Sequence, residues 1–161
     1  MTEGVEPEAT DKLSLRLWLR LLACSTEVEK TVRARLAEQF DTTLPRFDVL
    51  AALERAPDGL QLGELSRRLR VSNGNVTGIV TRLVAEGQVE RTVDPRDGRV
   101  FRARLTPAGR AAFLDMARAH QGWIASLFGG LGEAEQAQLL ALLTGLRHYL
   151  LEADNAGANP Q

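Results

Sequence analysis

The sequence contains few of the residues that build catalytic and metal sites. One cysteine and two histidines occur in 161 residues. A single cysteine excludes a disulfide framework within the chain, and neither histidine has a second ligand at metal-site spacing. There is also no glycine-rich phosphate loop, and no Ser/His/Asp or Cys/His arrangement typical of nucleophilic catalysis. We therefore expect neither an enzyme nor a bound metal or cofactor.

Long apolar runs are absent too. The sequence has no stretch of about 18 apolar residues, the length that a membrane-spanning helix needs. It also has no signal-peptide pattern. A cytoplasmic protein without a membrane partner is therefore expected. With 44% hydrophobic residues, the chain can form one compact protomer. The polar, small-residue ends, residues 1–11 and 154–161, are predicted to be disordered tails.

Positive charge is concentrated in one segment. The whole chain carries a net charge of −1, whereas residues 61–110 hold ten arginines and five acidic residues, a net charge of +5, which leaves −6 for the rest. This distribution argues against a non-specific polyanion binder. A basic segment within an acidic chain is the electrostatic pattern of localised DNA binding.

Two short helices are predicted at the start of this segment. Leucines spaced three and four apart place an apolar side on a helix that ends near Arg70 and Val71. Ser72 can cap a second helix, and Gly87 can end it. The buried stripe of that second helix is Val76, Ile79, Val80 and Leu83. Two helices joined by a tight turn form a helix-turn-helix, whose second helix enters the DNA major groove.

A charged β-hairpin follows. Residues 94–99 read DPRDGR, and the Asp-Pro and Asp-Gly pairs favour turns. On the far side, Phe101, Ala103 and Leu105 alternate with arginines, the pattern of a half-buried strand. Thr106 then caps a helix that has Pro107 at its first position. An arginine-tipped hairpin after a helical pair is typical of a nucleic-acid-binding wing.

The terminal segments favour a dimer. Residues 13–22 are apolar around most of a helix, and residues 139–151 form a second leucine-rich helix. Burying such surfaces is favourable, so packing these helices between two symmetric copies is the economical arrangement. A helix over about 106–128, ended by three glycines, joins the wing to this region. We expect one protomer over 12–153, with the winged helix-turn-helix at about 45–105 and dimerisation helices at about 12–40 and 106–153.

The helix-turn-helix, the DPRDGR wing and the LTPAG segment at 105–109 together resemble the MarR family of winged-helix transcriptional regulators. The resemblance implies a mainly α fold with a small β-hairpin wing, and a homodimer that binds an inverted-repeat operator in double-stranded DNA. It also implies that Arg96 reaches the minor groove and that Asp94, Asp97 and Arg99 brace the wing, Asp97 and Arg99 through ion pairs, with Arg99 also touching phosphate. Repression is a further expectation from the family.

The DNA contacts predicted from these patterns are Arg67, Ser72, Asn73, Asn75, Thr77, Arg82, Arg96 and Arg99. Asparagine can pair with the major-groove edge of adenine, although Asn73 and Asn75 could instead only start the helix. Phosphate contacts are expected from Arg67, Arg68 and the strand arginines. Family members often carry a basic residue where this chain has Gly78, so a close approach or an altered base contact is expected there.

The stretches LLAC at 21–24, LPRFD at 44–48 and SNGNVTG at 72–78 also resemble MarR-type regulators of aromatic-acid catabolism, which suggests an effector site. The implied effector is an aromatic acid or its coenzyme A thioester. Aromatic rings could stack on it and arginines could pair with its carboxylate. The candidate residues are Arg16, Trp18, Arg20, Arg46 and Phe47. The alternative is that the two aromatic residues belong to the core and that the arginines are solvated or ion-paired.

Two other functions stay open. Cys24 lies in an apolar helix and is interpreted as a buried thiol, but oxidant-sensing relatives use a reactive cysteine, so the alternative function is a redox-responsive DNA-binding regulator. The third is an interaction protein that uses the fold as a dimer platform. Sensitivity of DNA binding to peroxide, and to Arg96→Ala, would separate the three.

Overall fold

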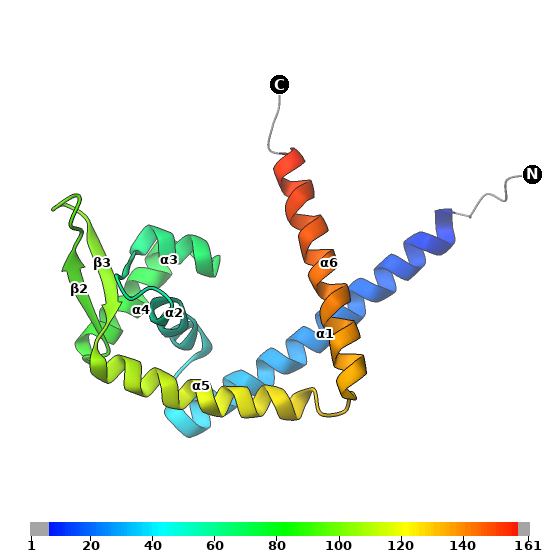
Figure 1. The fold of residues 1–161 in the computed structure, drawn as a ribbon, viewed down its shortest axis with the longest axis horizontal. Coiled ribbons are helices and arrows are strands. Elements are labelled where there is room, and N and C mark those ends of the chain that lie inside the picture. Colours follow the sequence, from blue (N-terminus) through cyan, green and yellow to red (C-terminus); the bar gives the residue numbers. More distant parts are fainter. Residues whose placement is uncertain (1–6, 158–161) are drawn as a thin grey trace, which may run out of the picture. The chain divides into compact units, whose positions relative to one another are not determined.

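The computed structural model describes residues 7–157, which divide into two compact units on either side of the Gln121–Gly122 bond. The first unit contains α1 (Pro7–Phe40), α2 (Leu44–Glu54), β1 (Leu60–Gln61), α3 (Leu62–Leu69), α4 (Asn73–Ala85), β2 (Val89–Val93), β3 (Phe101–Leu105) and most of α5 (Pro107–Leu127). The second contains the end of α5 and α6 (Glu133–Gly157). The mainly helical winged-helix prediction is confirmed (Figure 1).

Helices α2, α3 and α4 lie beside a three-stranded antiparallel sheet with strand order β1-β3-β2 (Figure 1). In the β2–β3 register, Val89 is opposite Leu105 and Val93 is opposite Phe101. The two-residue strand β1, which the sequence patterns did not indicate, pairs with the other edge of β3. The shared core contains Leu50, Leu53, Leu65, Val76, Val80, Leu83 and Val89.

The turn between α3 and α4 is built from local hydrogen bonds. Arg70 ends α3 in the left-handed conformation, with φ 55°, which reverses the chain direction sharply. The Ser66 hydroxyl donates to the carbonyl of Val71 across this turn. The Ser72 hydroxyl then accepts from the backbone N–H of Asn75 at 3.3 Å, as the predicted cap of α4. Gly87, with φ 74°, follows the end of that helix.

The start of α5 is docked on the start of β2. Thr106 accepts from the backbone N–H of Gly109 at 2.9 Å, which confirms the predicted cap. The backbone N–H of Thr106 donates to the Gln88 carbonyl at 3.1 Å. A Cβ at Gly109 would lie 1.8 Å from that carbonyl oxygen. Only glycine permits this approach of α5 to the strand.

Exposed apolar side chains occur on both terminal helices. In the N-terminal half of α1 they are Leu13, Leu15, Leu17, Trp18, Leu19, Leu21 and Leu22, and in α6 they are Leu139, Leu140, Leu142, Leu143, Leu146, Tyr149, Leu150 and Leu151. The C-terminal half of α1 instead has Val32 and Leu36 buried. None of the described helices combines the length and apolar character needed to cross a membrane.

Three expectations need correction. The predicted tails are too long, because 7–11 and 154–157 are helical; extending an existing helix costs far less than starting one. The remainder of both tails lies outside the described residues. Cys24 is exposed rather than buried, because the helix around it packs on no other element of its own compact unit. Phe101 is also exposed rather than half-buried, since the hairpin extends beyond the core there.

Candidate nucleic-acid interface

Helix α4 presents the face that was predicted to contact DNA. Val76, Val80 and Leu83 are fully buried, so the opposite side of the helix faces solvent. The exposed residues of the predicted set are Ser72, Asn73, Asn75, Thr77 and Arg82. Gly78 is also exposed, and a Cβ built there would meet no atom within 4 Å. No close approach within the described chain therefore explains this glycine.

The base of the wing is held by one buried carboxylate. Asp94 is only 4% exposed, and its Oδ2 accepts from Arg102 Nε at 2.7 Å. Its Oδ1 accepts from the Arg96 N–H at 2.8 Å, and Gln61 donates to Oδ2 at 3.3 Å. Arg102 also donates to the carbonyl of Gly59 at 2.9 Å. These bonds connect the hairpin to the strand that precedes α3.

This network changes the acidity of Asp94. The hydrogen bonds from Arg102 and from the Arg96 backbone stabilise the carboxylate and outweigh the effect of burial. They lower the pKa of Asp94 from 3.8 to about 2. The carboxylate is therefore charged at all physiological pH values, which fixes the turn at the start of the wing.

Asp94 braces the wing as predicted, but among the described residues neither Asp97 nor Arg99 forms the ion pair expected of it. Asp97 accepts from the backbone N–H of Arg99 at 3.0 Å, which closes the tip of the turn. The cation that pairs with Asp94 is Arg102, because the strand register brings it to this buried carboxylate. Arg99 and Arg96 remain exposed at the tip.

The arginines of residues 61–110 fall into two groups. Arg68, Arg102, Arg104 and Arg110 are paired with carboxylates. Among the described residues no carboxylate pairs with Arg67, Arg70, Arg82, Arg91, Arg96 or Arg99, and all six of these side chains are exposed. The second group supplies uncompensated positive charge from α3, α4 and the wing, which is the requirement for contacting phosphates.

Two of the strand arginines expected to contact phosphates have carboxylate partners within the chain. Arg104 pairs with Glu90 at 2.6 Å, and Arg102 is engaged at the wing base. Sequence reasoning did not single out Arg91, which donates to Thr81 of α4 at 3.1 Å, or Arg70 in the turn. The period-2 pattern of the strand places Arg91 opposite Ala103. That pattern was the sequence signal that could have identified Arg91.

The predicted effector residues are not brought together in one site. Phe47 is buried, with its ring 5.5 Å from Phe113 and 5.0 Å from His120. Arg16, Trp18 and Arg20 lie along the exposed half of α1. Arg46 lines a pocket formed with residues of α1, α5 and the end of α4.

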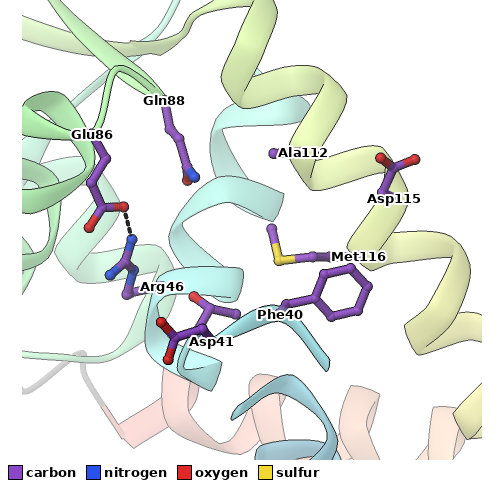
Figure 2. A pocket seen from close by; sticks show the side chains of 9 residues that line it. Phe40, Asp41, Arg46, Glu86, Gln88, Ala112, Asp115 and Met116 are labelled. Carbon is purple, nitrogen blue, oxygen red and sulfur yellow. Dashed lines mark hydrogen bonds and ion pairs between the residues drawn. The ribbon is translucent and has the colours of Figure 1, made fainter. Parts of the chain in front are cut away.

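That pocket has a volume of about 440 Å³ (Figure 2). Arg46 forms an ion pair there with Glu86, the residue that ends α4, and its Nε is buried without a hydrogen-bond partner. Phe40 and Met116 lie on the other side. The lining residues are Phe40, Asp41, Thr42, Arg46, Glu86, Gln88, Ala112, Asp115 and Met116. Within the described residues, no group of three or more metal-ligating side chains occurs.

A three-helix core, a capped recognition helix and a braced hairpin define a winged helix-turn-helix DNA-binding protein. The model of the MarR family matches residues 40–100. The crystal structure of a MarR family transcriptional regulator from Silicibacter pomeroyi is 33% identical, with a TM-score of 0.75, over 88% of this chain and 97% of that one. The chain belongs to the MarR family of transcriptional regulators.

Two further similarities are to individual regulators. It is 35% identical to the transcriptional activatory protein BadR of Rhodopseudomonas palustris over 105 residues, 64% of this chain and 59% of BadR. The chain thus spans less than two thirds of BadR. A mutant form of MarR from E. coli, solved in complex with operator DNA, is 27% identical with a TM-score of 0.71, covering 81% of this chain and 93% of that one. The family is one of DNA-binding transcription regulators and not of enzymes.

Proposed function

We propose that the protein is a homodimeric repressor that reads an inverted-repeat operator and is released by an aromatic acid or its coenzyme A thioester. The DNA-binding part rests on the exposed arginines of α3, α4 and the wing. Among the residues described, these arginines have no carboxylate partners. Fixed positive charge on the elements that would face the duplex supplies affinity, and the polar face of α4 supplies base contacts.

The reading mode uses both grooves. In this proposal α4 enters the major groove with Asn73, Asn75 and Thr77 at base edges, while Arg96 enters the minor groove. Two copies related by a two-fold axis would read half-sites about one helical turn, ~10 bp, apart. The exposed leucines of α1 and α6 are the surface that a second copy would bury. We propose repression as the family expectation.

The effector part rests on Arg46. Its guanidinium connects the pocket to the end of the recognition helix through Glu86. A carboxylate ligand would compete with Glu86 for this cation, and Phe40 and Met116 offer apolar cover to a ring. A space of about 440 Å³ holds an aromatic acid or the acyl group of a thioester, while the nucleotide of coenzyme A would extend outside. Ligand binding would thereby alter the position of α4.

The test is DNA binding to fragments that flank the protein's own gene, with benzoic and hydroxycinnamic acids and their thioesters added in turn. We expect one of them to release the DNA from the wild-type protein, and Arg46→Gln to abolish the response while leaving DNA binding in place. Arg110→Gln is the matched control. Like Arg46, Arg110 pairs with a carboxylate, here Glu54 of α2, but it lies outside the pocket. An unchanged response in Arg46→Gln would refute the site.

The same assay tests the wing and the redox alternative. Arg96→Ala should weaken DNA binding roughly ten- to a hundredfold, about 1–3 kcal/mol, without changing the mass of the dimer. Unaltered affinity would remove the wing from the mechanism. If peroxide rather than a ligand releases the DNA, and Cys24→Ser prevents that release, the redox-responsive function replaces the one proposed.

A further inference from the structure

The two faces of the β2–β3 hairpin differ in what they carry. Residues directly opposite each other in the register share a face. One face bears Glu90 with Arg104 and Thr92 with Arg102; the other bears the pairs Val89–Leu105, Arg91–Ala103 and Val93–Phe101. Val89 and Ala103 are buried, so the second face is the one turned toward the helical core. Arg91 on this face reaches Thr81 of α4 at 3.1 Å.

The far end of that face is apolar and uncovered. Val93 is 55% exposed and Phe101 is 54% exposed, although both lie on the side that faces α4. They stand one pair beyond Arg91 and directly before the arginine-bearing tip. An exposed valine and phenylalanine on a short hairpin are unfavourable in water unless something covers them.

We propose that Val93 and Phe101 form a seat for one sugar–phosphate strand of the operator, packing against the deoxyribose carbons between the two groove contacts. This inference rests on the proposed function. When α4 lies in the major groove and the tip in the neighbouring minor groove, the strand that separates the grooves passes in front of the face that joins them. That face is the one occupied by Arg91, Val93 and Phe101.

The surrounding charge favours nucleic acid over a protein partner. Arg91, Arg96 and Arg99 flank the apolar pair, and none of them has a carboxylate partner among the residues described. Of the nearby carboxylates, Asp94 and Glu90 are paired with Arg102 and Arg104, and Asp97 at the tip accepts from the Arg99 backbone N–H. A deoxyribose offers apolar C–H groups beside anionic phosphates, which matches an apolar pair set among unpaired arginines.

The double variant Val93→Thr/Phe101→Thr tests the seat. Threonine is β-branched and keeps the strand propensity of the hairpin while removing apolar area. We expect the affinity for the operator fragment to fall on the order of tenfold with an unchanged salt slope, because no charge is removed. Hydroxyl-radical protection of the deoxyriboses between the groove contacts should also be lost. Thr92→Val, on the opposite face of the same strand, is the control and should change neither quantity.

The outcomes separate this inference from the proposed function. If the wild type shows no preference for its fragment, both are overturned. If the wild type binds specifically and the folded double variant binds with equal affinity and protection, only the seat is overturned. Normal DNA binding combined with lost regulation in cells would assign Val93 and Phe101 to a protein partner and also overturn the seat. A reduced salt slope would show that the substitutions acted through charge, which contradicts it as well.

Discussion

The carboxylate of Asp94 and the guanidinium of Arg102 meet at 2.7 Å across the base of the hairpin. The same arginine donates to the Gly59 carbonyl ahead of α3. The wing is thereby connected to the segment that leads into the helix-turn-helix. Since Asp94 is almost fully buried, a neutral or missing carboxylate would leave Arg102 without its partner in a half-buried position.

This pair makes part of the stability dependent on pH. The pKa of Asp94 is lowered from 3.8 to about 2. Because the folded-state value lies below the unfolded one, the stabilisation is fully present above pH 3.8 and is lost as the pH falls through about 2. Asp94→Asn should flatten the stability profile in this window and weaken DNA binding at neutral pH. Denaturant unfolding at a series of pH values checks this; identical profiles for the two proteins would contradict it.

Arg67 and Arg68 are neighbours on α3, but they differ in whether a carboxylate pairs with them. Arg68 lies 2.6 Å from Glu64, whereas Arg67 has no carboxylate partner among the described residues. Arg67→Ala should therefore lower the slope of log affinity against log salt by about 1. Arg68→Ala should lower it less, because Glu64 already compensates its charge. Binding titrations at several salt concentrations measure both slopes. An equal decrease in slope for the two variants would disprove the distinction between paired and unpaired arginines.

Two glycines should respond oppositely to alanine. Gly109→Ala places a Cβ 1.8 Å from the Gln88 carbonyl oxygen, and we expect a loss of about 3 kcal/mol in the free energy of unfolding. Gly78→Ala meets no atom within 4 Å on an exposed helix and should raise that free energy by about 0.5–1 kcal/mol. Chemical denaturation of both variants provides the measurement. A tolerated Gly109→Ala would show that the contact between α5 and β2 is looser than the structure indicates.

The exposed leucines of α1 provide a test of the dimer. Leu17 is 64% exposed in the single chain, so Leu17→Lys should leave the protomer folded. A charge in a buried interface is costly, and the variant should become monomeric by light scattering at concentrations where the wild type is dimeric. Thr26→Lys on the same helix is the control for added charge. A dimeric Leu17→Lys protein would exclude this part of α1 from the interface.

Local chemistry made much of the fold predictable. Ser72 and Thr106 cap the helices that follow them, and Gly87 follows the end of α4, because each depends only on residues within one turn. The alternation of residues 101–105 likewise identified a strand. These elements were sufficient to indicate the winged helix-turn-helix.

Contacts set by strand register and packing were not predictable in this way. Asp94 pairs with Arg102, eight residues away, rather than joining a brace of Asp97 and Arg99, because the hairpin register decides which side chains meet. The grouping of the effector candidates depends on packing in the same way. Arg46 reaches a pocket only through the packing of α1, α2 and α5, and that packing places Phe47 in the core. An apolar neighbourhood also could not reveal that Cys24 is uncovered in a single chain.

The central claim is sequence-specific DNA reading by the winged helix-turn-helix. Its most direct measurement is the ratio of affinities for a fragment flanking the protein's own gene and for an unrelated fragment of equal length, at one salt concentration. We predict a ratio of at least about 10³, with two protomers per bound duplex. Equal affinities for the two fragments would contradict the account.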